Sequence, residues 1–145
     1  MGSIIDTRKV KAVLNLDPVS VNNSHGIVHK NGRTFKYKNE KTKSFEKAFS
    51  FEFDRYMEDF LKFAAWQNEL QCPIHATYIF YLPNCYKQDG IINKRGKDLT
   101  NCIKVLEDCI FKAISIDDAF CTEVHAFKKG ALLAKVEIEL SLIYS

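Results

Sequence analysis

Long hydrophobic runs are missing from this sequence. No stretch approaches the roughly 18 apolar residues that a membrane-spanning helix requires, which argues against an integral membrane protein. The first residues, Met1–Asp6, also lack the charged and apolar regions of a signal peptide. We therefore expect the chain to remain in the compartment where it is made.

Cysteine is present without a metal or disulfide spacing. The cysteines are odd in number, and no two of them form a Cys-x-x-Cys pair. They are Cys72, Cys85, Cys102, Cys109 and Cys121. We interpret them as reduced, small core residues of an intracellular protein, with a metal or redox role as the lesser alternative.

Motifs for several common enzyme classes are also lacking. The sequence has neither a glycine-rich phosphate-binding loop nor the Gly-x-Ser-x-Gly elbow, so no residues support nucleotide hydrolysis or a serine hydrolase. A zinc site through His25-x-x-x-His29 is an alternative, but the pair falls in a loop and no cysteine pair follows it. His75 and His125 fit better as ordinary residues of a sheet.

What the sequence does contain suits one globular domain over residues 1–145. Of 145 residues, 46% are apolar and 27% are charged, enough for a core without disulfides. The formal net charge is only +3, but basic residues cluster in two segments. One runs from His25 to Lys43 with Glu40 as its single acid, and the other comprises Lys87, Lys94, Arg95 and Lys97. Such clusters favour contact with nucleic-acid phosphates, although each alone could be a solvated surface.

The apolar pattern predicts an α+β fold. Alternation predicts strands over Val10–Leu16, Ile74–Leu82 and Val136–Leu142, with residues 119–128 extended and a turn at Lys129-Gly130. Asn31-Gly32 between short apolar pieces predicts a basic β-hairpin. A stripe of aromatic residues predicts one long helix from about Thr42 to Leu70, and a second helix runs from about Lys97 to Ile114. We expect about four strands in one mixed sheet and two main helices.

The second predicted helix has a polar side that can carry chemistry. At about 100° per residue, Asn101, Lys104 and Asp108 lie opposite the apolar face, with Asp98 at the edge of the polar group. Asp117-Asp118 follow just past the helix, and a divalent cation would offset the repulsion between them. Magnesium prefers one or two carboxylates, so Asp98 and Asp118 brought together would suffice. As isolated patterns, a polar helix face and an Asp-Asp turn are also ordinary structure.

These residues occur in an order that resembles a known family. The elements are Lys97-Asp98-Leu99-Thr100-Asn101-Cys102-Ile103-Lys104, then Glu107-Asp108 and Ile116-Asp117-Asp118-Ala119. Together with the upstream elements Pro18-Val19-Ser20-Val21-Asn22 and Gly32-Arg33, they resemble the signature of the RusA family of Holliday-junction resolvases. The similarity spans roughly residues 14 to 140. Because the order and spacing of separate elements agree, the resemblance is more specific than any single motif.

The resemblance implies a homodimer that cuts branched, four-way DNA junctions by paired symmetric nicks. Magnesium would be the cofactor, with manganese as an alternative, and the cytoplasm of a bacterial or phage-infected cell the location. Asp98, Asp117 and Asp118 would bind metal, and Asp98, Lys104 and Asp118 would be catalytic. Thr100, Asn101 and Asp108 would support them. Contacts to DNA are expected from Asn22, Lys30, Arg33, Lys94, Arg95 and Lys97.

One position departs from the family pattern. Thr100 stands where relatives have a second aspartate, and a hydroxyl cannot replace the charge of a carboxylate. A catalytically inactive protein that binds branched DNA is therefore the main alternative, and a plain interaction protein whose acidic pair is only a turn is a third.

Overall fold

A mixed four-stranded sheet forms the centre of the molecule. The computed structural model describes residues 8–18, 25–30, 33–38, 40–94 and 98–144, with the backbone alone described for 25–30 and 33–38. The strands lie in the order β1 (Lys9–Leu14), β6 (Lys135–Leu142), β4 (Ile74–Leu82) and β5 (Cys121–Gly130). β6 pairs antiparallel with β1 and β4, whereas β5 pairs parallel with β4. The predicted α+β fold with a mixed sheet is confirmed.

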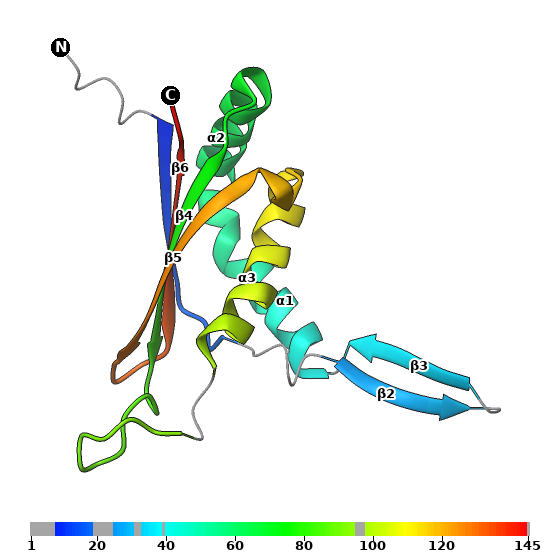
Figure 1. Cartoon of the computed structure of the whole chain (residues 1–145), viewed down its shortest axis with the longest axis vertical. Helices are drawn as coiled ribbons and strands as arrows, with labels where there is room; N and C mark the ends of the chain where they lie inside the picture. The colour runs from blue at the N-terminus through cyan, green and yellow to red at the C-terminus, as the bar shows by residue number, and fades with distance from the viewer. Residues whose placement is uncertain (1–7, 19–24, 31–32, 39, 95–97, 145) are drawn as a thin grey trace.

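Helices cover one face of this sheet. Figure 1 shows α1 (Glu40–Phe53), α2 (Met57–Leu70) and α3 (Leu99–Ile114) on the same side of the strands. Successive side chains of a strand point to opposite faces, so Ala76, Tyr78 and Phe80 of β4 point toward the helices and are fully buried. His75 and Thr77 point to the other face and are only half-buried. The sheet therefore has one face in the core and one face open among the described residues.

The long helix predicted from Thr42 to Leu70 is wrong in one respect, because it is two helices. A 3-10 turn, η3 (Asp54–Tyr56), separates α1 from α2. The aromatic row crosses the break without interruption, since the Phe53 ring lies edge-on to Phe60 with centroids 4.6 Å apart. At the break, the Tyr56 hydroxyl donates to the Val13 carbonyl oxygen at 3.0 Å. The tighter turn thus fits the helix to the sheet while keeping the rings in the core.

The predicted hairpin is confirmed in its backbone. β2 (His25–Lys30) pairs antiparallel with β3 (Arg33–Lys38), and Lys30 is opposite Arg33. The central Asn31-Gly32 lies outside the described residues. In Figure 1 the two strands extend away from the four-stranded sheet. The hairpin is therefore a separate two-stranded element.

The turn predicted at Lys129-Gly130 is also wrong, because β5 continues through both residues. Gly130 is still in register with Leu82 of β4, and the Ala131 amide donates to the Leu82 carbonyl oxygen at 3.2 Å. Pairing with β4 carries the strand beyond the local turn signal.

None of the helices in the described ranges combines the length and apolarity that a membrane crossing needs.

Candidate active site

The amino-terminal end of α3 presents an exposed carboxylate. Asp98 is the N-cap residue, with extended backbone angles, yet within the described residues its side chain makes no capping hydrogen bond. Its Oδ2 accepts a long hydrogen bond, 3.4 Å, from the Asn101 amide. An N-cap carboxylate normally accepts a hydrogen bond from a backbone amide of the helix. Because Asp98 accepts none from the described backbone there, its oxygens retain lone pairs for a ligand. The helix dipole also favours negative charge at this end.

The polar face predicted for α3 is present and accessible. The Lys104 ammonium lies 3.3 Å from the Asp108 carboxylate, and the two side chains are 61% and 57% exposed. Thr100 is also exposed, in the first turn of the helix. On the opposite side, Leu106 and Ile110 are buried against the sheet. The structure thus separates a core face from a charged face along the whole helix.

The carboxyl-terminal end of α3 differs because its carboxylates are part of a turn. The helix ends at Ser115, whose φ of 55° lies in the left-handed region and turns the chain toward β5. Asp117 then caps a short 3-10 turn, η4 (Asp118–Phe120), by accepting from the Ala119 amide at 2.9 Å. Asp118 is exposed and begins that turn. One carboxylate here has a structural partner and the next is open to solvent.

A partly buried hydrogen-bond network connects the middle of α3 with β4 and β5. The Tyr78 hydroxyl donates to Glu107 Oε2 at 2.7 Å, and the Cys121 thiol donates to the same oxygen at 3.6 Å. Burial, followed by the charges of Glu107 and Asp118, raises the pKa of the Cys121 thiol to about 12. Burial and then Glu107 raise the pKa of Tyr78 above its ordinary value. Both groups therefore stay protonated at neutral pH and hold Glu107 in place.

The two predicted metal-binding ends do not meet within one chain. α3 has 16 residues, which corresponds to about 24 Å between its ends at the rise of an α-helix. Asp98 precedes the helix and Asp118 follows it, and Figure 1 shows β5 starting from the far end. The expectation that one chain brings Asp98 and Asp118 to the same ion is wrong. Each end does offer exposed carboxylate oxygens, which are the donors that magnesium prefers.

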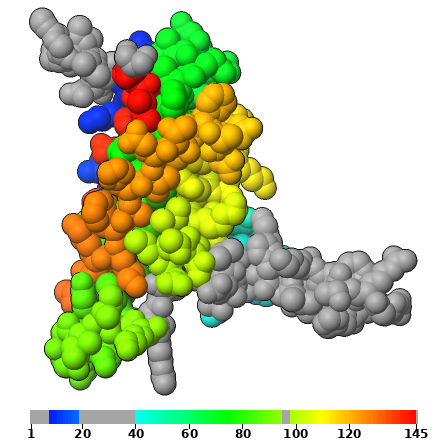
Figure 2. All heavy atoms as spheres, viewed as in Figure 1, coloured from blue at the N-terminus to red at the C-terminus, as the bar shows by residue number. Residues whose placement is uncertain are grey.

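The predicted DNA-contacting residues fall at two places. Lys30 and Arg33 are at the tip-side ends of β2 and β3. Lys94 is exposed and lies in the segment between β4 and α3, whereas Asn22, Arg95 and Lys97 lie outside the described residues. Figure 2 shows this segment (green) next to α3 (yellow) and β5 (orange) on one face of the molecule. Lys94 is thus five positions before the first residue of α3.

One group of polar residues was not predicted as a site. His75 and His125 were correctly expected in the sheet, but the structure brings them together with Glu123 on its open face. Sequence spacing could not reveal this group, since the pairing of β4 with β5 creates it.

A comparison with protein families agrees with the residue pattern. The family model described as Endodeoxyribonuclease RusA matches residues 16–141. This range includes the four-stranded sheet apart from its first strand and the last residue of β6, together with α1, α2 and α3. A search of curated proteins finds no match.

Proposed function

Since the chain belongs to the RusA family of endodeoxyribonucleases, we propose that it is a magnesium-dependent endonuclease that resolves four-way DNA junctions by paired symmetric nicks. The observation that carries the proposal is the exposed polar face of α3, where Asp98, Asn101 and Lys104 lie in the order of the family signature. The working location is the cytoplasm of a bacterial or phage-infected cell.

The residues of α3 suit attack on a phosphodiester. A phosphodiester is already anionic, and nucleophilic attack by water adds charge that cationic and hydrogen-bonding groups stabilise. A divalent cation, when bound, supplies Lewis-acid stabilisation of that charge. The Lys104 ammonium is placed to donate to a phosphate oxygen, and Asp108 at 3.3 Å holds it on the exposed face of α3. Asn101 orients the Asp98 carboxylate through its amide.

The length of α3 argues for a site built by two subunits. One chain cannot place Asp98 and Asp118 on one ion, but a two-fold dimer can set the start of one α3 beside the end of the other. Symmetry would then generate two identical sites, which is what paired nicks on a two-fold-symmetric junction require. Homodimerisation is thus part of the proposed mechanism, with Asp117 and Asp118 supplied by one subunit and Asp98 by the other.

The basic segments provide sequence-independent affinity for branched DNA. Lys30 and Arg33 on the hairpin, together with Lys94 beside α3, suit phosphate contacts that position the DNA backbone over the polar face. We expect binding to weaken with salt, with a log-log slope of about −0.9 for each phosphate contacted on duplex arms.

Cleavage of a labelled four-way junction tests the proposal. Purified protein would be incubated with the junction and with a matching linear duplex, each with and without magnesium. Symmetric nicks on the junction alone, dependent on metal, are the expected result. Tight junction binding without any cutting would overturn the nuclease and favour the inactive DNA-binding protein.

A substitution at Thr100, the position that departs from the family pattern, sharpens this test. Thr100 is exposed in the first turn of α3, two residues after Asp98. If its hydroxyl limits metal affinity, Thr100→Asp should lower the magnesium concentration needed for half-maximal cutting by about 10-fold, because ligand charge tunes the affinity of such sites. An unchanged magnesium requirement would show that other groups complete the site.

A further inference from the structure

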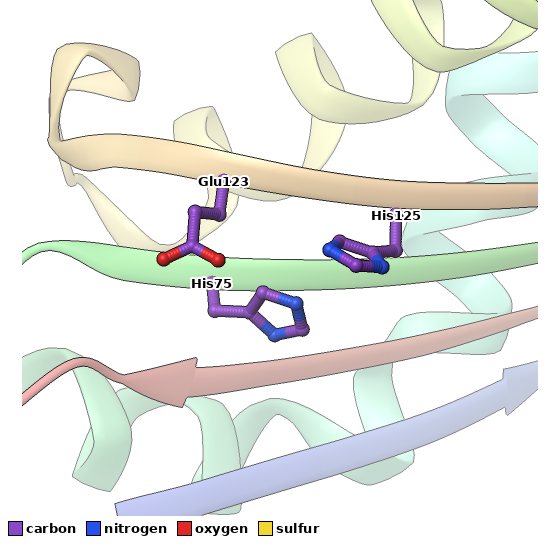
Figure 3. A group of neighbouring side chains, drawn as sticks. All are labelled: His75, Glu123 and His125. Atoms are coloured by element: carbon purple, nitrogen blue, oxygen red, sulfur yellow. The ribbon is translucent and has the colours of Figure 1, made fainter.

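The open face of the sheet carries a group of potential metal ligands away from α3. His75 is on β4, and Glu123 and His125 are two residues apart on β5. One nitrogen or oxygen ligand atom from each side chain lies within 4.8 Å of the others. Figure 3 shows the three side chains gathered on the same side of the two strands.

An irregularity in strand pairing creates this group. Ile74 pairs with Cys121, but the next residue, His75, pairs with Glu123, so Thr122 is an extra residue in β5. Cys121 points to the helices, where its thiol contacts Glu107, and regular alternation would point Glu123 the same way. The bulge reverses this and places Glu123 and His125 on the open face beside His75. Bulges are rare in parallel pairs and commonly re-aim side chains near functional sites.

The bulge itself is held by a contact of its first residue. The Cys121 thiol lies 3.7 Å from the Glu123 carbonyl oxygen as well as near Glu107. β4 is the more central of the two strands, since it is paired on both sides by β5 and β6. The backbone that presents the ligands is therefore fixed by pairing and by the core, and only the side chains remain to be oriented.

The geometry of the side chains is close to what a metal ion needs. The imidazole rings of His75 and His125 lie edge to face with centroids 4.9 Å apart. Ligands on a tetrahedral zinc ion are separated by about 3.3 Å, given bond lengths near 2.0–2.1 Å. Glu123 and His125 are exposed and His75 is half-buried, so small side-chain rotations can close the remaining gap.

We propose that His75, Glu123 and His125 form a binding site for a divalent transition-metal ion of the zinc class. Two imidazoles and a carboxylate are a zinc ligand set, with the fourth position open to water on the uncovered face of the sheet. Magnesium is a poor fit because it prefers oxygen ligands. The site is distinct from the carboxylates around α3, which packs against the opposite face of the sheet. A bound ion would add a side-chain cross-link between the edge strand β5 and its neighbour β4.

Zinc binding to the full-length, untagged chain tests this site. Calorimetric titration should find one zinc ion per chain at this site, and His75→Ala, His125→Ala or Glu123→Gln should each weaken binding by about 10-fold or more. Cobalt should give the visible absorption of a low-symmetry, four- or five-coordinate ion, and that signal should be lost in the same variants. Zinc at 100 times its dissociation constant should raise the melting temperature by about 5 °C or more.

Two control variants separate this site from other ligands. The double variant His25→Ala/His29→Ala removes the histidine pair of the hairpin and should leave the zinc titration unchanged. Glu137→Gln removes an acid from β6, farther along the same sheet, and should also have no effect. Zinc affinity that is equal in the wild type and in His75→Ala, or lost with the hairpin histidines instead, would overturn the proposal. Saturating magnesium should not displace the zinc, and displacement would likewise contradict it.

Discussion

The two ends of α3 carry the same chemical groups in different settings. At the amino-terminal end, the carboxylate of Asp98 caps nothing among the described residues and meets only the amide of Asn101. At the other end, Asp117 caps a turn, and Asp118 lies near the partly buried network of Tyr78, Glu107 and Cys121. The fold thus uses the Asp117 carboxylate in a turn, whereas Asp98 at the other end caps nothing in the described part of the chain and Asp118 is open to solvent. Substitution at the amino-terminal end should therefore reduce activity alone. Substitution at the carboxyl-terminal end should reduce both activity and stability.

Asp98→Asn should have the largest effect. Loss of a metal-binding carboxylate should reduce junction cleavage by more than about 100-fold, because even removal of an outer-shell partner commonly costs 10- to 100-fold. Junction binding should persist or strengthen, since a negative charge facing phosphate is removed. Stability should change by less than about 0.5 kcal/mol, as for other surface substitutions.

Asp59→Asn is the matched control for that variant. Asp59 is likewise an exposed carboxylate, in the first turn of α2. Cleavage assays and urea unfolding of both proteins would compare the two positions. Equal losses of cleavage in the two variants, or unfolding of Asp98→Asn, would make Asp98 a structural residue.

Tyr78→Phe should have the largest effect on stability of the changes considered. It removes the hydroxyl that donates to Glu107 at 2.7 Å and leaves a half-buried carboxylate with one partner fewer. Hydrogen bonds to charged groups contribute about 1.5–3 kcal/mol, so the free energy of unfolding should fall by about that amount. Urea unfolding measures it, with Tyr144→Phe as the exposed control. A loss below about 0.5 kcal/mol would show that the hydrogen bond from Tyr78 to Glu107 does not anchor α3 to the sheet.

Asp117→Ala should have a smaller effect on stability. The carboxylate accepts from the Ala119 amide, and loss of a capping bond typically costs about 1 kcal/mol. Asp117→Asn keeps a capping oxygen and should recover most of that loss while still removing the charge. If the two variants are equally destabilised, the charge of Asp117 and not its hydrogen bond matters for folding.

The last expected effect is confined to alkaline pH and concerns the pH dependence of unfolding. In the folded chain, burial and then the charge of Glu107 raise the pKa of the Cys121 thiol from its ordinary value of 9.0 to about 12. The unfolded chain therefore loses this proton first as pH rises. The contribution of Cys121 is fully present below about pH 9 and is lost between about pH 9 and 12. Stability measured across this range should fall less steeply in Cys121→Ala, and identical slopes would contradict the shift.

Local periodicity predicted much of the fold. The strands β4 and β6 and the two faces of α3 follow from alternation and helical spacing, which depend only on neighbouring residues. The break at η3 could not be predicted in this way, because the aromatic spacing continues across it and Phe53 still packs on Phe60.

The candidate site was predicted less completely, for a physical reason. Asp98 and Asp118 are both elements of one linear signature, and a signature does not state which parts meet in space. The rise per residue of a 16-residue helix separates them. The group on the open face depends on a bulge in the pairing of β4 with β5, and such a bulge has no local sequence signal.

Mixing two inactive variants tests the two-subunit site most directly. Asp98→Asn and Asp118→Asn would be refolded separately and together, and each sample assayed on the four-way junction with magnesium. In a mixed dimer, symmetry leaves one site with both substitutions and one site intact, and about half of the dimers in an equal mixture are mixed. We predict that the mixture recovers nicking of single strands, without paired cuts, while each variant alone is inactive. A mixture as inactive as its components would contradict a site shared between subunits.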